Sequence, residues 1–395
     1  MRHIDTAERR ARLLRRHHLV SGHRAADPAQ AAAGVVVLHA TDPASVHLQV
    51  LARLREPDIS AVERALYEER ELVRMLGMRR TMFVAPVGFA PVVQAAAARA
   101  VAVRERRRLV QRITPAVREL GAAGVEAWLA DVQESTLGAL RARGEATAAE
   151  LSADEPRLRT QVLMAEGKKY EAWTNITTWV LNQLSVEGRI VRGRPRGTWI
   201  SSQYRWSPLE RWLPGGLPDL PAADARAALI RAWLERFGPG TVADIKWWTG
   251  FTLAEVHAAL TAIAPADVDL GGTPGLLLAD DLDPVPPPDE PEVALLPALD
   301  PTPMGWQQRD WYLGVHKESL FDRNGNIGPT IWWEGRIVGG WAQRGDGELA
   351  YRLREDIGAD GVAAVEKALA QLAALIGPVR FVPRFRTPLE RDLAG

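Results

Sequence analysis

The side chains best suited to chemistry are a histidine and a threonine, two positions apart, in a short segment after an apolar run. His39 and Thr41 follow the apolar run 35–38, and Asp42 and Pro43 come next. A residue before proline is pushed towards extended geometry, and residues i and i+2 of an extended segment point the same way. The spacing therefore predicts an imidazole and a hydroxyl on one side of a loop. In a second interpretation, Thr41 or Asp42 caps the next helix and His39 packs at its edge.

The elements around residues 39–42, which we call the connector, follow the order of a winged helix. A helix is expected over 29–38, before the connector. Pro43 suits the first turn of a helix, which we expect over 43–54. The capping-box pattern Ser60-Ala-Val-Glu63 begins a third helix, ending near residue 68. Two short strands are then expected at 71–76 and 79–85. Three helices and a two-stranded ribbon form a helix-turn-helix variant.

A basic hairpin is predicted over 187–200, after an amphipathic helix at 173–184. Arg192, Arg194 and Arg196 stand at alternate positions, so on a strand they face one way. Their guanidinium groups suit phosphates or a minor groove. In the alternative interpretation this is a charged, solvent-exposed hairpin without a ligand. Further candidate phosphate contacts near it are Lys168, Lys169 and Arg189.

A third helix-turn-helix pattern is expected over 223–278. Thr241-Val-Ala-Asp244 and Thr252-Leu-Ala-Glu255 are capping boxes, and Thr249-Gly250 separates the two helices. Another capping box, Thr147-Ala-Ala-Glu150, belongs to the second pattern. The third pattern carries few positive charges, so we expect it to be structural.

The last quarter of the chain changes to strand patterns. An acidic, proline-rich linker precedes it, at 280–291. The expected strands are 293–297, 330–333, 336–341, 348–353 and 380–383, with a helix at 360–375. This order predicts a small α+β or barrel-like C-terminal domain.

The predicted fold class is α+β, with tandem winged-helix units followed by a small β-rich, barrel-like domain. The expected segments are an Arg-rich helical arm (1–24), a first winged-helix unit with the connector (25–90), a helical linker and second unit with the basic hairpin (91–215), a third unit (216–282), the acidic linker (283–292) and the C-terminal domain (293–395).

Composition narrows the class of protein. The chain has 395 residues, 49 basic and 49 acidic side chains, and no cysteine. A disulfide framework, a thiolate nucleophile and a cysteine-based zinc site are therefore excluded. The eight histidines are scattered, and neither a secretory leader nor a membrane-spanning run is visible. We expect a cytoplasmic protein that uses no metal and no cofactor.

Several segments, in order, resemble the AlkZ/YcaQ-type superfamily of bacterial winged-helix DNA glycosylases. The resemblance implies the tandem winged-helix fold and hydrolysis of the N-glycosidic bond of N7- or N3-alkylated purines, bulky adducts included, by a monofunctional enzyme. The matching segments are 38–43 with Ala52-Arg53, 72–84, 237–250, 295–301 with Gly305 and Arg309, and 335–339 with Trp341.

The catalytic element of that family resembles Gln-Φ-Gln or Gln-Φ-Asp, where Φ is an apolar residue. The resemblance implies that His39 and Thr41 occupy the two polar positions of this motif. A histidine can accept a proton, whereas a threonine orients water but is not a base at neutral pH. Asp42 is the only carboxylate close enough in sequence to substitute. A rival placement is His47-Leu48-Gln49, but side chains i and i+2 of a helix diverge by about 200°.

The implied partner is double-stranded DNA that carries an alkylated or adducted base, bound by a monomer. Arg53, Arg79 and Arg80 lie near the connector in sequence, and either line the DNA cleft or pair with Glu68, Glu69 and Glu71. The alternative hypothesis, from a different class, is a winged-helix DNA-binding protein without catalysis, with a regulatory or damage-binding role.

Overall fold

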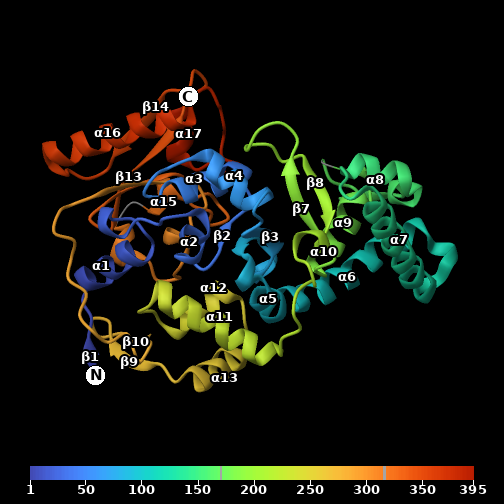
Figure 1. Ribbon diagram of the computed structural model, residues 1–395, viewed down its shortest axis with the longest axis horizontal. Coiled ribbons are helices and arrows are strands. Elements are labelled where there is room, and N and C mark those ends of the chain that lie inside the picture. Colours follow the sequence, from blue (N-terminus) through green and yellow to red (C-terminus); the bar gives the residue numbers. More distant parts are fainter. Residues whose placement is uncertain (170, 315–316) are drawn as a thin grey trace. The chain divides into compact units, whose positions relative to one another are not determined.

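The computed structural model describes residues 1–169, 171–314 and 317–395 and shows a mixed α/β protein (Figure 1). Its residues group into two compact units. Unit 1 comprises Met1–Leu72, Phe83–Pro86 and Arg226–Gly395, and unit 2 comprises Val73–Met82 and Val87–Ala225. Unit 1 is therefore built from both ends of the chain. The six-segment division and the tandem winged-helix architecture stay predictions.

In unit 1, a short strand replaces the end of the helix expected before the connector. α2 (Pro28–Ala33) is shorter than predicted. β2 (Leu38–His39) pairs antiparallel with β4 (Met82–Pro86), and places His39 opposite Phe83. The apolar run thus enters a sheet, and its last strand residue is the candidate catalytic histidine.

The helices after the connector begin at aspartate caps. α3 (Pro43–Leu51) begins at Asp42, and α4 (Ile59–Tyr67) begins at Asp58. The prediction that Ser60 starts the third helix is wrong, because the Asp58 carboxylate already accepts N–H groups of the first turn. The expected N-terminal helix is α1 (Thr6–Arg16), and η1 (Ser21–His23) follows it.

The two capped helices and the glycine break expected in the third pattern are present, whereas its assignment as a helix-turn-helix unit stays a prediction. Thr241 and Thr252 complete capping boxes at the starts of α12 (Val242–Thr249) and α13 (Leu253–Ile263), and Gly250 ends α12 in the left-handed conformation. The neighbouring elements are α11 (Ala222–Phe237) and a three-stranded sheet of β1 (Arg2–His3), β9 (Ala266–Asp269) and β10 (Pro274–Leu277).

The C-terminal strands form an open antiparallel sheet, and among the described residues no barrel closes. Its order is β11 (Val293–Leu296), β12 (Thr330–Trp333), β13 (Arg336–Gln343) and β14 (Leu349–Leu353). α16 (Gly358–Ile376) packs against β11, and α17 (Pro388–Ala394) packs against β13. Shorter helices of this part are η8 (Thr302–Met304), α14 (Asp310–Leu313) and α15 (Lys317–Leu320).

The strand expected at 380–383 is absent, and α17 was not predicted. The N–H group of Phe381 donates to the Gln343 side chain instead of to a neighbouring strand. Thr387 caps α17 and Pro388 occupies its first turn, so a start signal was present.

Unit 2 is mostly helical around an apolar core. α6 (Arg99–Ile113), α7 (Gly121–Arg143) and α9 (Thr177–Val186) contribute core residues such as Leu129 and Leu184. Its strands are β3 (Leu72–Leu76), β5 (Gln161–Met164), β6 (Ala172–Asn175), β7 (Ile190–Pro195) and β8 (Tyr204–Pro208). The other helices are α5 (Ala90–Val93), α8 (Ala148–Asp154), α10 (Leu209–Trp212), η2 (Met78–Arg80), η3 (Val87–Phe89), η4 (Gln94–Ala98), η5 (Thr114–Ala116), η6 (Arg118–Leu120) and η7 (Pro156–Arg159).

The start of the amphipathic helix expected in unit 2 is a strand. The helix expected from Trp173 starts only at Thr177, because residues 172–175 pair with β5; Trp173 is 63% exposed and is not a core residue.

In the described part of the chain, the helical run Val87–Ala116 alone is long and apolar enough to span a membrane. Half of its apolar window is buried inside the protein.

Candidate active site

The connector is held by a buried glutamine on the helix that follows it. Gln49 is fully buried on α3. Its Oε1 atom accepts the backbone N–H of His39 at 3.1 Å, and its Nε2 atom donates to the His39 carbonyl at 3.0 Å. One side-chain amide therefore fixes the peptide groups on both sides of His39, as a neighbouring strand would.

The imidazole of His39 is half-buried beside an aromatic ring. Its centroid lies 5.8 Å from that of Phe83, in an edge-on arrangement. The N–H group of Thr41 points at Nδ1 from 3.5 Å, the long limit of a hydrogen bond. This contact favours the tautomer with its proton on Nε2. Thr41 is also half-buried, so the two predicted residues share one loop.

Asp42 acts as a helix cap. Its side chain is buried, and both oxygens are occupied: Oδ1 accepts the N–H of Ala44 at 3.0 Å, and Oδ2 accepts the N–H of Arg384 at 2.8 Å. The second interpretation drawn from the sequence is therefore correct for Asp42. Its carboxylate is not placed to replace a catalytic carboxylate.

The rival pair, His47 and Gln49, does not converge on one site. Both side chains are fully buried. The Nε2 atom of His47 lies 3.0 Å from a carboxylate oxygen of Glu63, while Gln49 binds the backbone of His39. The predicted divergence along the helix explains why they meet different partners.

Arg53 is a buried structural residue, so the prediction that it contacts DNA is wrong. Its guanidinium group forms two hydrogen bonds of 2.8 Å with Asp300, and both side chains are fully buried. It also donates to the Gln49 carbonyl at 2.7 Å and to the Thr302 hydroxyl at 2.8 Å. Every one of these contacts is internal to unit 1.

The Arg53 network ends at a buried histidine. The Thr302 hydroxyl lies 2.9 Å from Nδ1 of His17, and Nε2 of His17 lies 3.1 Å from the Arg236 carbonyl. Burial, reinforced by the charge of Arg53, lowers the pKa of His17 well below its ordinary value of 6.5. His17 is therefore neutral at neutral pH, and a hydrogen-bonded chain connects it to the helix that holds the connector.

In unit 2, the basic hairpin forms from β7 and β8, but its second strand lies later in the sequence than predicted. The register shifts between Arg192 and Pro195, so strict alternation of the three arginines ends there. Arg192 is half-buried, donates to Asn182 at 3.0 Å and lies over the Trp206 ring at 5.2 Å. Arg194 and Arg196 are exposed, and Arg196 sits at the end of the hairpin, where its N–H binds the Gln203 carbonyl.

The remaining candidate cations of unit 2 are at the surface. Arg189 forms a bidentate pair with Glu134 at 2.6 and 2.7 Å. Arg80 pairs with Glu105 at 2.7 Å, and not with the acidic residues at 68–71 that the sequence suggested. Other exposed candidate cations of this unit are Arg79, Lys168 and Lys169.

Sequence reasoning missed two residues of the connector's surroundings. Gln49 was considered only as part of a rival motif; its signal was an amide within the apolar run 48–51 of the helix. Arg384 approaches the connector from the far end of the chain: its exposed guanidinium group lies 3.5 Å from the Thr41 carbonyl. No local sequence pattern predicts a contact across 343 positions. Within the described residues, no cluster of three or more potential metal ligands occurs.

Comparison with known proteins places these features in a family. The DNA glycosylase AlkZ of Streptomyces sahachiroi has a similar solved structure, with a TM-score of 0.71 and 19% sequence identity. The match covers 96% of this chain and 100% of that one, and at this identity it establishes the fold. No curated protein sequence matches this chain. The family model "DNA glycosylase AlkZ-like" matches residues 32–375, which confirms the resemblance drawn from the sequence. The chain belongs to the AlkZ-like DNA glycosylase family.

Proposed function

We propose that this protein is a monofunctional DNA glycosylase that hydrolyses the N-glycosidic bond of N7- or N3-alkylated purines in duplex DNA, bulky adducts included. The observation that carries the proposal is the clamp of Gln49 on His39. A buried amide that binds both peptide groups of one residue fixes that residue's position. His39 is also the position at which the family motif places its first polar residue.

The chemistry suits a site without a strong acid. Alkylation at N7 or N3 makes the purine cationic, so the base leaves as a neutral molecule and needs no proton. A water oxygen forms a bond to the sugar carbon C1′ as the bond from C1′ to the base nitrogen breaks. The Nδ1 atom of His39, which holds the long contact from the Thr41 N–H, takes the proton lost by the water, and the Thr41 hydroxyl orients that water. The connector contains no lysine for an imine intermediate, which supports a monofunctional enzyme.

DNA contacts are assigned to exposed or half-buried cations of each unit. In unit 1, the Arg384 guanidinium group is exposed beside the connector, and we assign it a phosphate near the reacting sugar. In unit 2, the assigned phosphate contacts are Arg79, Arg80, Lys168, Lys169, Arg189, Arg192, Arg194 and Arg196. The tandem winged-helix architecture belongs to this same proposal.

One observation favours a second candidate function. Both oxygens of Asp42 are engaged, so the connector offers no carboxylate for activating water. A DNA-binding protein without catalysis is therefore the alternative.

Base release decides between the two. Duplexes with N7-methylguanine or a bulky guanine adduct are incubated with wild type, His39→Ala and Thr41→Ala, under single-turnover conditions. We expect His39→Ala to lower the rate by about 10²-fold or more, the usual contribution of a proton acceptor, with DNA affinity unchanged. His23→Ala, at an exposed histidine of unit 1, is the matched control. No release by wild type, with salt-dependent binding intact, would establish the non-catalytic alternative.

A further inference from the structure

A segment near the end of the chain presents its exposed side chains in the order cation, apolar residue, cation. It comprises residues 380–384, which we call the strap, and lies between α16 and α17 (Figure 1). Burial alternates along it: the exposed side chains are Arg380, Val382 and Arg384, and the buried ones are Phe381 and Pro383. Such alternation is typical of an extended segment, in which residues i and i+2 point the same way. The three exposed side chains therefore share one face.

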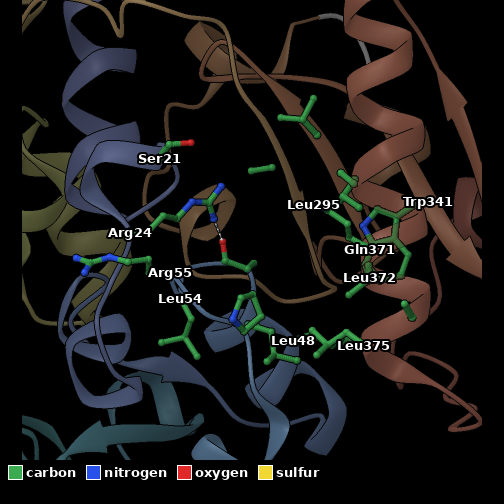
Figure 2. Close-up of a pocket in the computed structure, with 17 residues that line it drawn as sticks. Ser21, Arg24, Leu48, Leu54, Arg55, Leu295, Trp341, Gln371, Leu372 and Leu375 are labelled. Atoms are coloured by element: carbon green, nitrogen blue, oxygen red, sulfur yellow. Dashed lines mark hydrogen bonds between the residues drawn. The ribbon is translucent and has the colours of Figure 1, made fainter.

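The buried face fixes one end of the strap to the interior of unit 1. The N–H group of Phe381 donates to Gln343 at 3.0 Å, and its ring meets that of Trp341 edge-on, with 6.4 Å between centroids. Trp341 is itself held, because its indole N–H donates to the Leu296 carbonyl at 3.1 Å. Figure 2 shows the Trp341 ring beside Gln371 of α16, where it lines a cavity. Phe381 thus packs on a ring that is fixed by other parts of unit 1.

The other end of the strap is attached to the connector. The N–H group of Arg384 donates to Oδ2 of Asp42 at 2.8 Å, and its guanidinium group lies 3.5 Å from the Thr41 carbonyl. Two residues of an extended segment span about 7 Å, so Val382 follows Arg384 closely. The exposed face of the strap is therefore held beside the loop that carries His39.

Both cations of the strap keep their charge for an external anion. The Arg380 guanidinium group donates to the carbonyl oxygens of Gly377, Val379 and Asp346, at 2.8 to 3.2 Å. These neutral oxygens orient the guanidinium group but do not neutralise it. In the part of the chain that the structure describes, no carboxylate lies within ion-pair distance of Arg380 or Arg384.

Val382 is an apolar side chain left in water between these two cations. It is 65% exposed. A single exposed apolar residue is common at a protein surface and needs no explanation by itself. Here, however, it shares a face with two arginines and lies close to the connector. DNA offers partners for all three side chains, because its phosphates bind cations and its base steps accept apolar side chains.

We propose that the strap binds one DNA strand beside the reacting nucleotide, with Arg380 and Arg384 on phosphates and Val382 packed against the neighbouring base pair. An apolar side chain that enters a base step unstacks it in part. Val382 thereby loosens the stacking of the reacting nucleotide and exposes its sugar to the water at His39. The inference rests on the proposed glycosylase function for its substrate, but unstacking can be measured without base release.

The first test measures unstacking on DNA that the protein cannot hydrolyse. The duplex carries 2-aminopurine, which fluoresces more strongly when it unstacks, beside a 2′-fluorinated N7-methylguanosine, whose glycosidic bond resists hydrolysis. We expect saturating wild type to raise the fluorescence, Val382→Ala to lose most of this rise, and Val382→Ile to restore it. Leu282→Ala, at an exposed apolar residue of the acidic linker, is the control and keeps the wild-type rise.

The second test separates the apolar contact from the charges. With N7-methylguanine duplexes, we expect single-turnover base release by Val382→Ala to fall about tenfold, the effect of losing two buried methyl groups. The slope of its log affinity against log salt stays at the wild-type value. Arg384→Ala instead reduces this slope by about 0.9, the release of roughly one counterion. Thermal melts show that each variant is folded.

The outcomes distinguish the strap from the glycosylase function. A rise in fluorescence with Val382→Ala that equals the wild-type rise overturns the proposal. So does a wild-type protein that releases N7-methylguanine without unstacking the neighbouring base. Unstacking that depends on Val382, in a protein that releases no base, supports the strap and refutes the glycosylase function.

Discussion

Each unit contains an arginine bound by one carboxylate through two hydrogen bonds, and the two pairs differ in burial. In unit 1, Arg53 and Asp300 are completely buried, with both hydrogen bonds at 2.8 Å. In unit 2, the side chains of Arg189 and Glu134 are 29% and 62% exposed, with hydrogen bonds of 2.6 and 2.7 Å. The two pairs thus have similar hydrogen-bond geometry but differ in their exposure to solvent. Water screens the surface pair and leaves its cation near solvent, whereas the buried pair is cut off from any external anion.

The comparison shows that an arginine near a motif in sequence does not mark a nucleic-acid surface. Arg53 follows the connector closely and was expected at DNA, yet it binds the Gln49 carbonyl from inside the fold. Its influence on the candidate site is positional, because Gln49 in turn holds His39. The arginines that remain candidates for DNA are those whose guanidinium groups reach solvent.

The largest predicted effect separates the two pairs by stability. We expect Arg53→Met to lower the free energy of unfolding by about 3–5 kcal/mol, because Asp300 is left charged and buried without its cationic partner, with only the Thr302 N–H still donating to it. Arg189→Met is the matched change at the surface pair, and we expect a loss of at most about 1 kcal/mol. Urea unfolding of both variants measures the difference.

A compensating variant controls for this result. Arg53→Met combined with Asp300→Leu removes both buried charges, and we expect it to recover most of the lost stability. Similar losses in Arg53→Met and Arg189→Met would show that burial does not distinguish the pairs.

The next effect tests whether the buried network positions the candidate site. In Gln49→Glu, a protonated carboxyl can still donate to the His39 carbonyl, but an ionised one cannot. We therefore expect base release to fall at least about tenfold below wild type at pH 8, which corresponds to roughly 1.4 kcal/mol, and to recover towards wild type at pH 5.5. Dividing the rate of the variant by that of wild type at each pH cancels the pH dependence that comes from the titration of His39 itself.

DNA affinity and melting temperature are measured at both pH values. A positioning role requires the rate ratio to change with pH while affinity stays constant. Loss of rate that follows only the loss of folded protein would make Gln49 a purely structural residue.

A smaller effect follows from the neutral state of His17. Burial lowers its pKa in the folded protein, while the unfolded chain keeps a value near 6.5. Above pH 6.5, His17 is neutral in both the folded and the unfolded protein, so it does not change the free energy of unfolding. Below pH 6.5, His17 binds a proton in the unfolded chain but stays neutral in the folded protein. The free energy of unfolding is then expected to decrease by up to about 1.4 kcal/mol per pH unit as pH falls from 6.5 towards the folded pKa. Urea unfolding between pH 7 and 5, compared with His17→Gln, measures this slope, and an identical slope in the variant would contradict it.

Helices whose ends depend on neighbouring residues were predicted from the sequence. Features that depend on residues far away in the sequence were missed. Pro43, Gly250 and the threonine capping boxes located helix ends correctly, because a cap acts within one turn. The connector was located by the same local chemistry. The burial of Arg53 depends on Asp300, 247 positions away, and no pattern near either residue reveals the pair. The helix expected from Trp173 failed for the same reason, since pairing with β5 decides that segment.

The smallest predicted effect concerns a single surface arginine of unit 2. Arg196 is exposed at the end of the basic hairpin, and we assign it one phosphate contact. Arg196→Ala is expected to weaken binding to all duplexes equally, and to reduce the slope of log affinity against log salt by about 0.9, the release of roughly one counterion. Arg323→Ala removes an arginine of unit 1 that is also exposed and has no assigned contact, and its slope is expected to match wild type. Titrations at several salt concentrations, with intact and alkylated duplexes, measure both slopes. Equal slopes in the two variants would mean that the charge of Arg196 acts no differently from any other surface charge, and would confine the hairpin to a structural role.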